Sequence, residues 1–260
     1  MDLGIKGRTA IVCASSRGLG KACATALAAE GVTVVINGLN EERLEASAEE
    51  IRQASGSNVI AVQANINTVD GRRTLLSAAP QADILINNNA GPEPGNFMNY
   101  GYEQWNQALE AHFLSAFFMI QALLPGMRER RFGRIINIAS ALVKSPRSPQ
   151  MTLSIATRTA LIAACKAISR DVVADNVTIN NILPERIDTD RQRFMAERMV
   201  KESDISVEEA YRRIADTLPA KRLGRPEEFG AACAFLRGAQ AGFINGQHLQ
   251  LDGGGYSGLI

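Results

Sequence analysis

The sequence has few of the features that mark specialised classes of protein. Its 28 basic and 27 acidic residues leave a net charge of +1, so no overall field attracts nucleic acid or an anionic membrane. The four cysteines are scattered through apolar stretches without a C-x-x-C pair, which is typical of buried small hydrophobic residues. No apolar run reaches the roughly 18 residues of a membrane span, and the opening MDLGIKGRTA does not resemble a signal peptide. We therefore expect a soluble, cytoplasmic protein without a metal site, a nucleic-acid partner or a membrane partner.

Strand-like and helix-like segments alternate along the whole chain. Several of the strand-like segments are continuously apolar, as strands buried on both faces must be. The predicted strands are 8–13, 32–37, 58–64, 82–87, 133–140, 176–183 and 247–252. Helical spacing is found between them, and we expect Pro125 and Gly126 to mark a bend near the end of a long helix over 103–131. The pattern predicts a single α/β domain, residues 1–260, with a doubly wound parallel sheet of about seven strands and helices on both faces.

A glycine-containing loop, ASSRGLG, lies between the first strand and its helix. Gly18 and Gly20 permit a tight turn and a close approach of the backbone to a ligand. The helix that follows presents free N–H groups and a positive dipole end, which suit a pyrophosphate. The loop therefore predicts a dinucleotide site, although tight turns without a ligand also use such glycines.

Several motifs in a fixed order resemble those of the short-chain dehydrogenase/reductase family over nearly the whole chain. The family's loop is T-G-x-x-x-G-x-G, and here Ala14 replaces the first glycine, a change that would be strained at a positive φ. The matching segments are CASSRGLG (13–20), NNAG (88–91), GRIINIAS (133–140), GRPEE (224–228), INGQ (244–247) and LDGG (251–254). The resemblance implies a nicotinamide cofactor and a homotetramer or homodimer built partly from the two long helices.

The segment after the second strand bears on the choice of cofactor. A carboxylate there would bond the adenosine ribose and repel a 2′-phosphate, but residues 37–40 read NGLN and contain no acid. Arg17 could pair with the extra phosphate, a position that resembles the NADP-preferring pattern of the family. Leu39 lies where many NADP enzymes carry a second arginine, and Arg17 could instead be a solvated surface charge. We expect NADP(H) to be favoured over NAD(H).

The resemblance also implies which residues hold the cofactor. These residues follow the ends of the predicted strands, which should converge on one crevice. They are Ala14, Ser15, Ser16, Arg17, Gly18, Leu19, Gly20, Gly38, Asn65, Ile66, Asn89, Ala90, Gly91, Arg158, Pro184 and Ile187.

Catalysis in the family uses a serine, a tyrosine, a lysine and an asparagine, and this chain matches only the first. Ser140 corresponds to the serine that orients the substrate. Counting within the family pattern puts Ser154 at the tyrosine, Arg158 at the lysine and His112 at the asparagine. The tyrosine–lysine route for the proton is therefore predicted to be absent.

The replacements differ in what they can do. Ser154 and Arg158 are four residues apart, so they share one face of a helix. Arg158 keeps the positive charge but cannot pass protons, and an aliphatic hydroxyl is a poorer acid than a phenol. His112, with an ordinary pKa of about 6.5, could feed protons through water to Ser140, Ser154 or the substrate. The alternative is a helix histidine satisfied by a backbone carbonyl.

For several other residues, the sequence leaves two possible roles open. Tyr100 and Tyr102 could bring a phenol into the site or merely line a wall, and Glu185 could be a base or an outward loop residue. The helical segment near 185–220 covers the substrate in the family. Its many arginines would suit an acidic substrate, or they could form a solvated face balanced by neighbouring acids.

We therefore predict an NADP(H)-dependent oxidoreductase that interconverts a small carbonyl substrate and its alcohol with a non-standard proton donor. One alternative is a lyase-like member without hydride transfer, similar to halohydrin dehalogenases. Another is a cofactor-binding protein without catalysis, which the loss of three family residues would fit.

Overall fold

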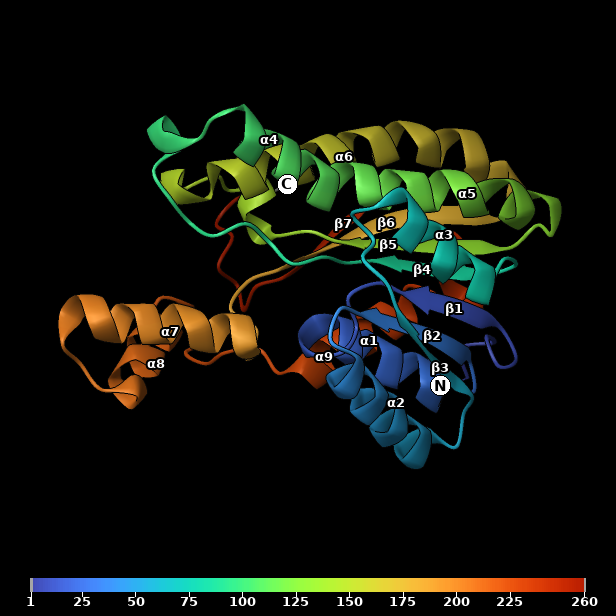
Figure 1. Cartoon of the computed structure of the whole chain (residues 1–260), viewed down its shortest axis with the longest axis horizontal. Coiled ribbons are helices and arrows are strands. Elements are labelled where there is room, and N and C mark those ends of the chain that lie inside the picture. The colour runs from blue at the N-terminus through green and yellow to red at the C-terminus, as the bar shows by residue number, and fades with distance from the viewer. Residues whose placement is uncertain (1, 260) are drawn as a thin grey trace.

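Seven parallel strands form the centre of the molecule (Figure 1). The computed structural model describes residues 2–259. The strands are β1 (Thr9–Val12), β2 (Thr33–Gly38), β3 (Val59–Gln63), β4 (Ile84–Asn87), β5 (Gly133–Ile138), β6 (Val177–Pro184) and β7 (His248–Leu251). Their order is β3-β2-β1-β4-β5-β6-β7, so the direction of winding reverses between β1 and β4. The predicted fold class is confirmed.

Side chains alternate between the two faces of the sheet, and both faces are buried. On β1, Ala10 and Val12 belong to one core cluster and Ile11 to the other. The continuous apolar runs in the sequence arise from this burial on both sides.

Helices cover each face of the sheet. One layer contains α1 (Gly18–Ala29), α2 (Glu41–Ser55) and α9 (Pro226–Phe235), and the other contains α3 (Val69–Ala78), α5 (Ser115–Glu129) and α6 (Thr152–Val172). Figure 1 shows the two layers below and above the sheet. All four cysteines are buried and free, as expected for small core residues.

The long helical segment before β5 is irregular at a place that the sequence did not indicate. It consists of α4 (Tyr102–Leu109), a π-helical turn (Glu110–Leu114) and α5. α5 continues through Pro125 to Glu129, so Pro125–Gly126 does not end the helix, and the predicted bend there stays a prediction. The departure from regular helix lies in the π-helical turn, where such features often mark functional sites.

Two helical stretches, Tyr102–Glu129 and Pro149–Asp175, are long and apolar enough to cross a membrane by length and composition alone. Core helices of soluble proteins pass the same test. Leu123 of α5 and Leu161 of α6 are buried in the core beside the sheet, and 39% and 28% of the two apolar windows are buried within the fold.

Helices α7 (Asp190–Ser203) and α8 (Val207–Asp216) project from the sheet layers (Figure 1). They have a small apolar cluster of their own, formed by Ala196, Ala210 and Ile214. The αL residue Asp204 ends α7, and Ser206 caps α8 by accepting a hydrogen bond from the Glu209 N–H. This pair of helices is the segment near 185–220 that the sequence analysis expected to cover the substrate.

Candidate active site

The candidate site lies at the carboxyl ends of the strands, beside the switch point between β1 and β4. In open sheets of this kind, the loops at a switch point separate and leave a crevice. The loop after β1, the NNAG turn after β4 and Ser140 after β5 all lie at this edge. Most of the site residues expected from the sequence are therefore brought to one edge of the sheet.

The glycine-rich loop has the shape of a phosphate cradle. Gly18 has a φ of +57°, and a Cβ on Gly20 would lie 2.4 Å from the Ala14 carbonyl oxygen, which no side chain tolerates. No side-chain cap closes the start of α1, so the N–H groups of its first turn are open to an anion. These features fit the pyrophosphate of a dinucleotide.

Ala14 occupies a position that requires a positive φ, here +45°. The strain anticipated for the replaced glycine is therefore present, at a cost of about 1 kcal/mol for a residue with a Cβ. Its neighbours hold the backbone: the Ala14 N–H donates to Asn37 Oδ1 at 3.2 Å, and Asn88 Nδ2 donates to the Ala14 carbonyl at 3.0 Å.

Asn37, at 2% exposure, organises the loop, a role that the sequence analysis missed. Its carbonyl accepts from the Ser15 N–H at 2.7 Å, and its own N–H donates to Ser15 Oγ at 3.0 Å. Its Nδ2 donates to the carbonyl of Ala64 at 2.8 Å. The sequence signal was an amide within an otherwise apolar strand, because a buried side-chain amide needs partners.

Arg17 and Gly38 border the adenosine end of the cradle. A Cβ on Gly38 would lie 3.0 Å from Ser16 Oγ, so this glycine lets β2 and the loop approach closely. Arg17 Nη1 donates to Asp190 Oδ2 of α7 at 3.0 Å, and both side chains are exposed. Arg17 is thus an exposed surface charge with an acidic partner in this structure, and its role toward a 2′-phosphate stays a prediction.

The remaining residues expected to contact the cofactor lie around the same edge. Asn65 begins the turn after β3, and Ile66 is buried in the core. Asn89 Nδ2 bonds Asn67 Oδ1 at 2.6 Å and the Ala111 carbonyl at 2.9 Å. Pro184 ends β6. The other positions are Leu19 in the first turn of α1, Ala90 and Gly91 after β4, and Ile187, which forms a bridge with Gly224.

Arg158 is the centre of the side-chain cluster at the substrate end. Its Nη1 donates to the Ile138 carbonyl at 2.6 Å, and its Nε donates to Ser154 Oγ at 3.2 Å. Its Nη2 lies 3.2 Å from His112 Nε2. A guanidinium has five N–H groups, so two remain for a ligand. Burial, and secondly the charge of Arg191, lower the pKa of Arg158 to about 10, which leaves it cationic at neutral pH.

His112 does not titrate near neutrality, contrary to the sequence expectation. Burial, followed by the charge of Arg158, lowers its pKa to about 2. Thr157 Oγ1 donates to the Leu153 carbonyl at 2.8 Å and contacts His112 Nδ1 at 3.1 Å. We assign the proton to Nδ1, so that Nε2 accepts from Arg158. The alternative of a histidine held by structural hydrogen bonds is therefore favoured, but the ring partners are the side chains of Thr157 and Arg158 instead of the expected backbone carbonyl.

The π-helical turn sets the position of His112. Arg72 of α3 donates to Glu110 Oε1 at 2.6 Å and to the Ile66 carbonyl at 2.8 Å. This part-buried ion pair fixes the start of the turn, and His112 follows two residues later. The residues are far apart in sequence, so no local pattern indicated the pairing.

A narrow cavity of about 20 Å³ lies among β4, the π-helical turn and α6. His112, Arg158 and Ser115 line it, together with Asn87. Asn87 Oδ1 is buried and has no hydrogen-bond partner within residues 2–259, while its Nδ2 donates to Asn137 Oδ1 at 2.9 Å. The volume and the free acceptor suit one water molecule.

Ser140 and Ser154 each keep a hydroxyl proton to donate. Ser140 Oγ accepts from the Leu142 N–H at 3.2 Å and caps a short 3-10 turn. Ser154 Oγ accepts from Arg158. The carbonyl oxygen of a substrate would meet O–H and N–H donors here, but no group with the acidity of a phenol.

The other candidates for an acid or base lie elsewhere. Tyr100 Oη is 3.5 Å from the Glu93 carbonyl, and Tyr102 is 83% exposed. Glu185 pairs with Arg147, and its side chain is 14% exposed, so it is not an outward loop residue. Its role as a base stays a prediction.

Most arginines of the α7–α8 region have acidic partners. The pairs are Arg198–Glu202, Arg212–Glu209, Arg213–Glu209, Arg222–Glu228 and Arg225–Glu228. For these residues, the expectation of a balanced, solvated face is the better one. Arg186, Arg191 and Arg193 differ from them, because none of the three has an acidic oxygen within ion-pair distance among the described residues.

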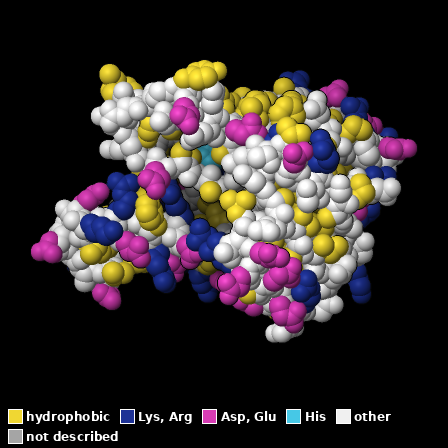
Figure 2. Space-filling model, viewed as in Figure 1, with side chains coloured by type: hydrophobic (Ala, Val, Ile, Leu, Met, Phe, Trp, Pro, Cys, Tyr) yellow, Lys and Arg dark blue, Asp and Glu magenta, His cyan; other side chains and the backbone are white. Residues whose placement is uncertain are grey.

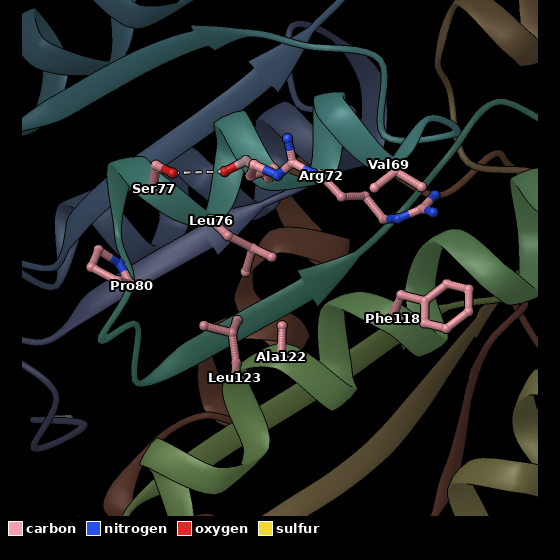
Figure 3. A pocket seen from close by; sticks show the side chains of 9 residues that line it. Val69, Arg72, Leu76, Ser77, Pro80, Phe118, Ala122 and Leu123 are labelled. Carbon is pink, nitrogen blue, oxygen red and sulfur yellow. Dashed lines mark hydrogen bonds between the residues drawn. The ribbon is translucent and has the colours of Figure 1, made fainter.

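A hollow of about 560 Å³ lies away from this edge (Figure 3). It lies between α3 and α5, where Leu76, Phe118 and Leu123 give it a mainly apolar lining. It contains none of the residues expected at the site, so we place the chemistry at the strand ends.

Comparison with known proteins identifies the family. A family model described as enoyl-(acyl carrier protein) reductase matches residues 13–256. This chain belongs to the short-chain dehydrogenase/reductase family. It is 34% identical to the NADPH-dependent reductase BacG of Bacillus subtilis (strain 168), over 95% of this chain and 97% of the relative. It is 32% identical to the uncharacterized oxidoreductase YvaG of the same organism, over 98% of each chain.

A solved structure of L-sorbose reductase from Gluconobacter frateurii, complexed with NADPH and L-sorbose, matches with a TM-score of 0.93. The identity is 30%, and all of both chains is covered. The predicted class, an NAD(P)-dependent oxidoreductase of this family, is confirmed by these matches. The expected preference for NADP(H) agrees with the cofactor named for this structure and for BacG.

Proposed function

We propose that this protein is an NADPH-dependent reductase that interconverts a small carbonyl compound and its alcohol without a phenolic proton donor. The observation that carries the proposal is the position of Arg158. The open phosphate cradle begins at the end of β1, and Arg158 bonds the last carbonyl of β5 at the same edge of the sheet.

The cofactor would lie along residues 14–20, with its pyrophosphate against the first turn of α1. Arg17 would bond the 2′-phosphate in place of Asp190, because a dianionic phosphate is a stronger partner than an exposed carboxylate. Gly91 would let the nicotinamide approach, since its Cβ position is 3.7 Å from His112 Nε2. Bound NADPH would supply the hydride.

The carbonyl oxygen of the substrate would receive hydrogen bonds from the Ser140 hydroxyl and from a free N–H of Arg158. As negative charge develops on that oxygen, a fixed guanidinium in a half-buried cleft stabilises it without rearranging. Arg158 keeps its own protons, because its pKa stays near 10. Its role is electrostatic, and His112 holds it in place.

The proton would pass through the Ser154 hydroxyl from water. Ser154 Oγ accepts from Arg158, so its own proton is free for the substrate oxygen. A water in the 20 Å³ cavity would satisfy Asn87 Oδ1 and connect the cluster to exchangeable protons. Because the alkoxide is far more basic than a phenolate, it can take a proton from such a relay without a side-chain acid.

The proposal also covers the helices around the site and the assembly of the chain. We propose that the helices α7 and α8 cover the bound substrate, and that the chain forms a homodimer or homotetramer through α5 and α6. Phe118 of α5 is 40% exposed on this helical layer. Light scattering coupled to gel filtration measures the mass of the oligomer and therefore the number of chains in it. The expected cytoplasmic location stays a prediction.

The test separates cofactor binding from turnover. Binding is measured by NADPH fluorescence, and turnover by NADPH oxidation across aldehydes, ketones, diketones and quinones. We expect tight NADPH binding, and we expect kcat/KM to fall by about 100-fold or more in Arg158→Met, as on removal of an oxyanion donor. The control is Arg170→Met, an exposed arginine on the same helix, which should match the unsubstituted protein.

The alternatives give other results. Tight NADPH binding without oxidation of any compound indicates a cofactor-binding protein without catalysis. Absence of NADPH binding favours the lyase-like alternative, and either result would overturn the proposed function.

A further inference from the structure

Arg191, in the first turn of α7, is one of three arginines of this region, with Arg186 and Arg193, that form no ion pair among the described residues, and it differs from those two in its contacts. Its Nη2 contacts the Pro92 carbonyl at 3.4 Å, and its guanidinium lies 5.5 Å from the Phe194 ring centre. Glu93 is near enough to raise its pKa, although burial, the largest cause, lowers the pKa overall. Within residues 2–259, no acidic oxygen comes within 4.0 Å of it.

The contact with Pro92 places Arg191 over the turn that borders Arg158. Pro92 follows Gly91 directly, and the Cβ position of Gly91 is 4.0 Å from Arg158 Nη2. Arg191 therefore reaches from the α7 side of the cleft towards the NNAG turn, while Arg158 reaches the same turn from α6. Figure 2 shows basic side chains on the borders of the hollow between the α7–α8 region and the sheet layers.

These two guanidinium groups repel each other. After burial, the charge of Arg191 is the next cause that lowers the pKa of Arg158, and it also contributes to the lowered pKa of His112. The neighbours of Arg158 are a hydroxyl, a carbonyl and a neutral imidazole, none of which neutralises its charge. An anion between the two arginines would remove this repulsion and occupy the two free N–H groups of Arg158.

We propose that Arg191 and Arg158 bind the carboxylate of the substrate, and that the compound reduced is a 2-oxo acid. In a 2-oxo acid the carbonyl oxygen lies beside the carboxylate, so one planar guanidinium can donate to both. The reaction is 2-oxo acid + NADPH + H⁺ → 2-hydroxy acid + NADP⁺. This inference rests on the proposed function, and it adds the class of substrate and a residue that selects it.

The test compares three compounds with one carbon skeleton: 2-oxo-4-phenylbutanoate, its ethyl ester and 4-phenyl-2-butanone. Initial rates of NADPH oxidation give kcat and KM for the unsubstituted protein, for Arg191→Gln and for Arg193→Gln. Arg193 is an exposed arginine two residues further along α7 and serves as the matched control. The acid should be reduced with the highest kcat/KM of the three.

Arg191→Gln should lose about 10- to 100-fold in kcat/KM for the acid, mainly through KM, as expected when one charged hydrogen-bond partner is removed. Its rates with the ester and the ketone should stay the same, and Arg193→Gln should leave all three unchanged. Equal losses on acid and ester in Arg191→Gln, or a preference of the unsubstituted protein for the ester, would overturn the proposal.

A second measurement does not depend on turnover. Oxamate, an unreactive carboxylate analogue of a 2-oxo acid, is titrated calorimetrically into the protein saturated with NADPH. The carboxylate site is supported if oxamate binds the unsubstituted protein and Arg193→Gln with the same affinity but binds Arg191→Gln more weakly. This holds even if no compound is reduced and the proposed function fails. Absence of oxamate binding, or equal binding by all three proteins, overturns the site while leaving the proposed function in place.

Discussion

The two ends of the candidate site are built from different parts of the chain. At the cofactor end, the cradle is formed by the backbone. It depends on the free N–H groups of α1, the positive φ of Gly18 and the missing side chain of Gly20. At the substrate end, the chemistry that we propose rests on the side chains of Ser140, Ser154 and Arg158. A replaced residue therefore has different consequences at the two ends.

Ala14 and Arg158 illustrate this difference. Ala14 departs from the family glycine, yet it adopts a φ of +45° and keeps the loop hydrogen bonds. Arg158 lies where the resemblance predicts the family lysine, and an arginine in that role would change which groups can carry a proton. The loop keeps its shape with an added methyl group, at a modest cost in strain. Acid–base chemistry, in contrast, depends on the identity of the side chain.

The largest effect is expected at the cofactor end, from Gly20→Ala. The added Cβ would lie 2.4 Å from the Ala14 carbonyl oxygen and 2.8 Å from the Ser15 Cα, so the loop must move away from α1. We expect the Kd for NADPH to rise by about 100-fold or more, which corresponds to about 2.7 kcal/mol. Fluorescence titration with NADPH measures this change.

Gly101→Ala is the control for that substitution. Gly101 has a φ of −88°, and its Cβ position is 3.4 Å from the end of the Gln104 side chain, which can move. This variant should bind NADPH normally. If Gly20→Ala also binds normally, the backbone cradle is not what holds the cofactor.

The second prediction concerns the substrate end and the charge of its histidine. Folded His112 has a pKa of about 2, whereas the unfolded value is about 6.5. Between these values the unfolded state binds a proton that the folded state does not, so stability falls as the pH falls below 6.5. The loss for this one group approaches about 1.4 kcal/mol per pH unit, or about 2.3 kcal/mol from pH 6.5 to 4.5, because the unfolded imidazole is already half protonated at pH 6.5.

His112→Gln should lose this part of the acid slope, which is the change in the free energy of unfolding with pH below 6.5, because glutamine does not titrate. Urea unfolding at several pH values between 4.5 and 7 measures the slope in each protein. His248→Gln is the control; burial lowers the pKa of this half-buried histidine too, but by less, so its removal should change the slope less. An unchanged acid slope in His112→Gln would mean that the imidazole is protonated in the folded protein.

The sheet could be predicted from the sequence because its signals are local. Apolar strands, glycine turns and helix stops lie within a few residues of the positions that they determine. The predicted strand 133–140, for example, contains β5 (Gly133–Ile138). The glycine loop was predictable for the same reason.

The electrostatic state of the site could not be predicted, because it depends on contacts between distant segments. The pKa of His112 is set by burial against α6 and by Arg158, 46 positions away. The Arg72–Glu110 pair and the Arg17–Asp190 pair likewise join residues far apart in the chain. Spacing in the sequence identified the participants, but only the fold shows which of them are charged and which are paired.

A smaller effect is expected from Ala14→Gly, which restores the family glycine. Glycine adopts a φ of +45° without a Cβ clash, so relief of strain should raise the free energy of unfolding by about 1 kcal/mol, less the extra entropy of an unfolded glycine. NADPH affinity should stay within about twofold, because the loop shape is already correct. Urea unfolding and fluorescence titration measure the two quantities. A gain in affinity above tenfold would show that the methyl group obstructs the cofactor, and that this end tolerates side chains less than we argue.

The smallest effect is expected from Asp190→Asn, at the contact between the loop and α7. Asp190 accepts from Arg17, and both side chains are exposed, so the pair itself contributes little to stability. Its removal frees Arg17 for the 2′-phosphate, and we expect NADPH affinity to rise by roughly twofold to fourfold, with NADH affinity unchanged. Asp188→Asn, an exposed neighbour, should change neither. In an Arg17→Ala background, the gain from Asp190→Asn should disappear, because the two effects share one guanidinium. If the gain persists there, or if NADH binding improves equally, Arg17 does not distinguish the two cofactors, and the selectivity of the cofactor end must come from the backbone alone.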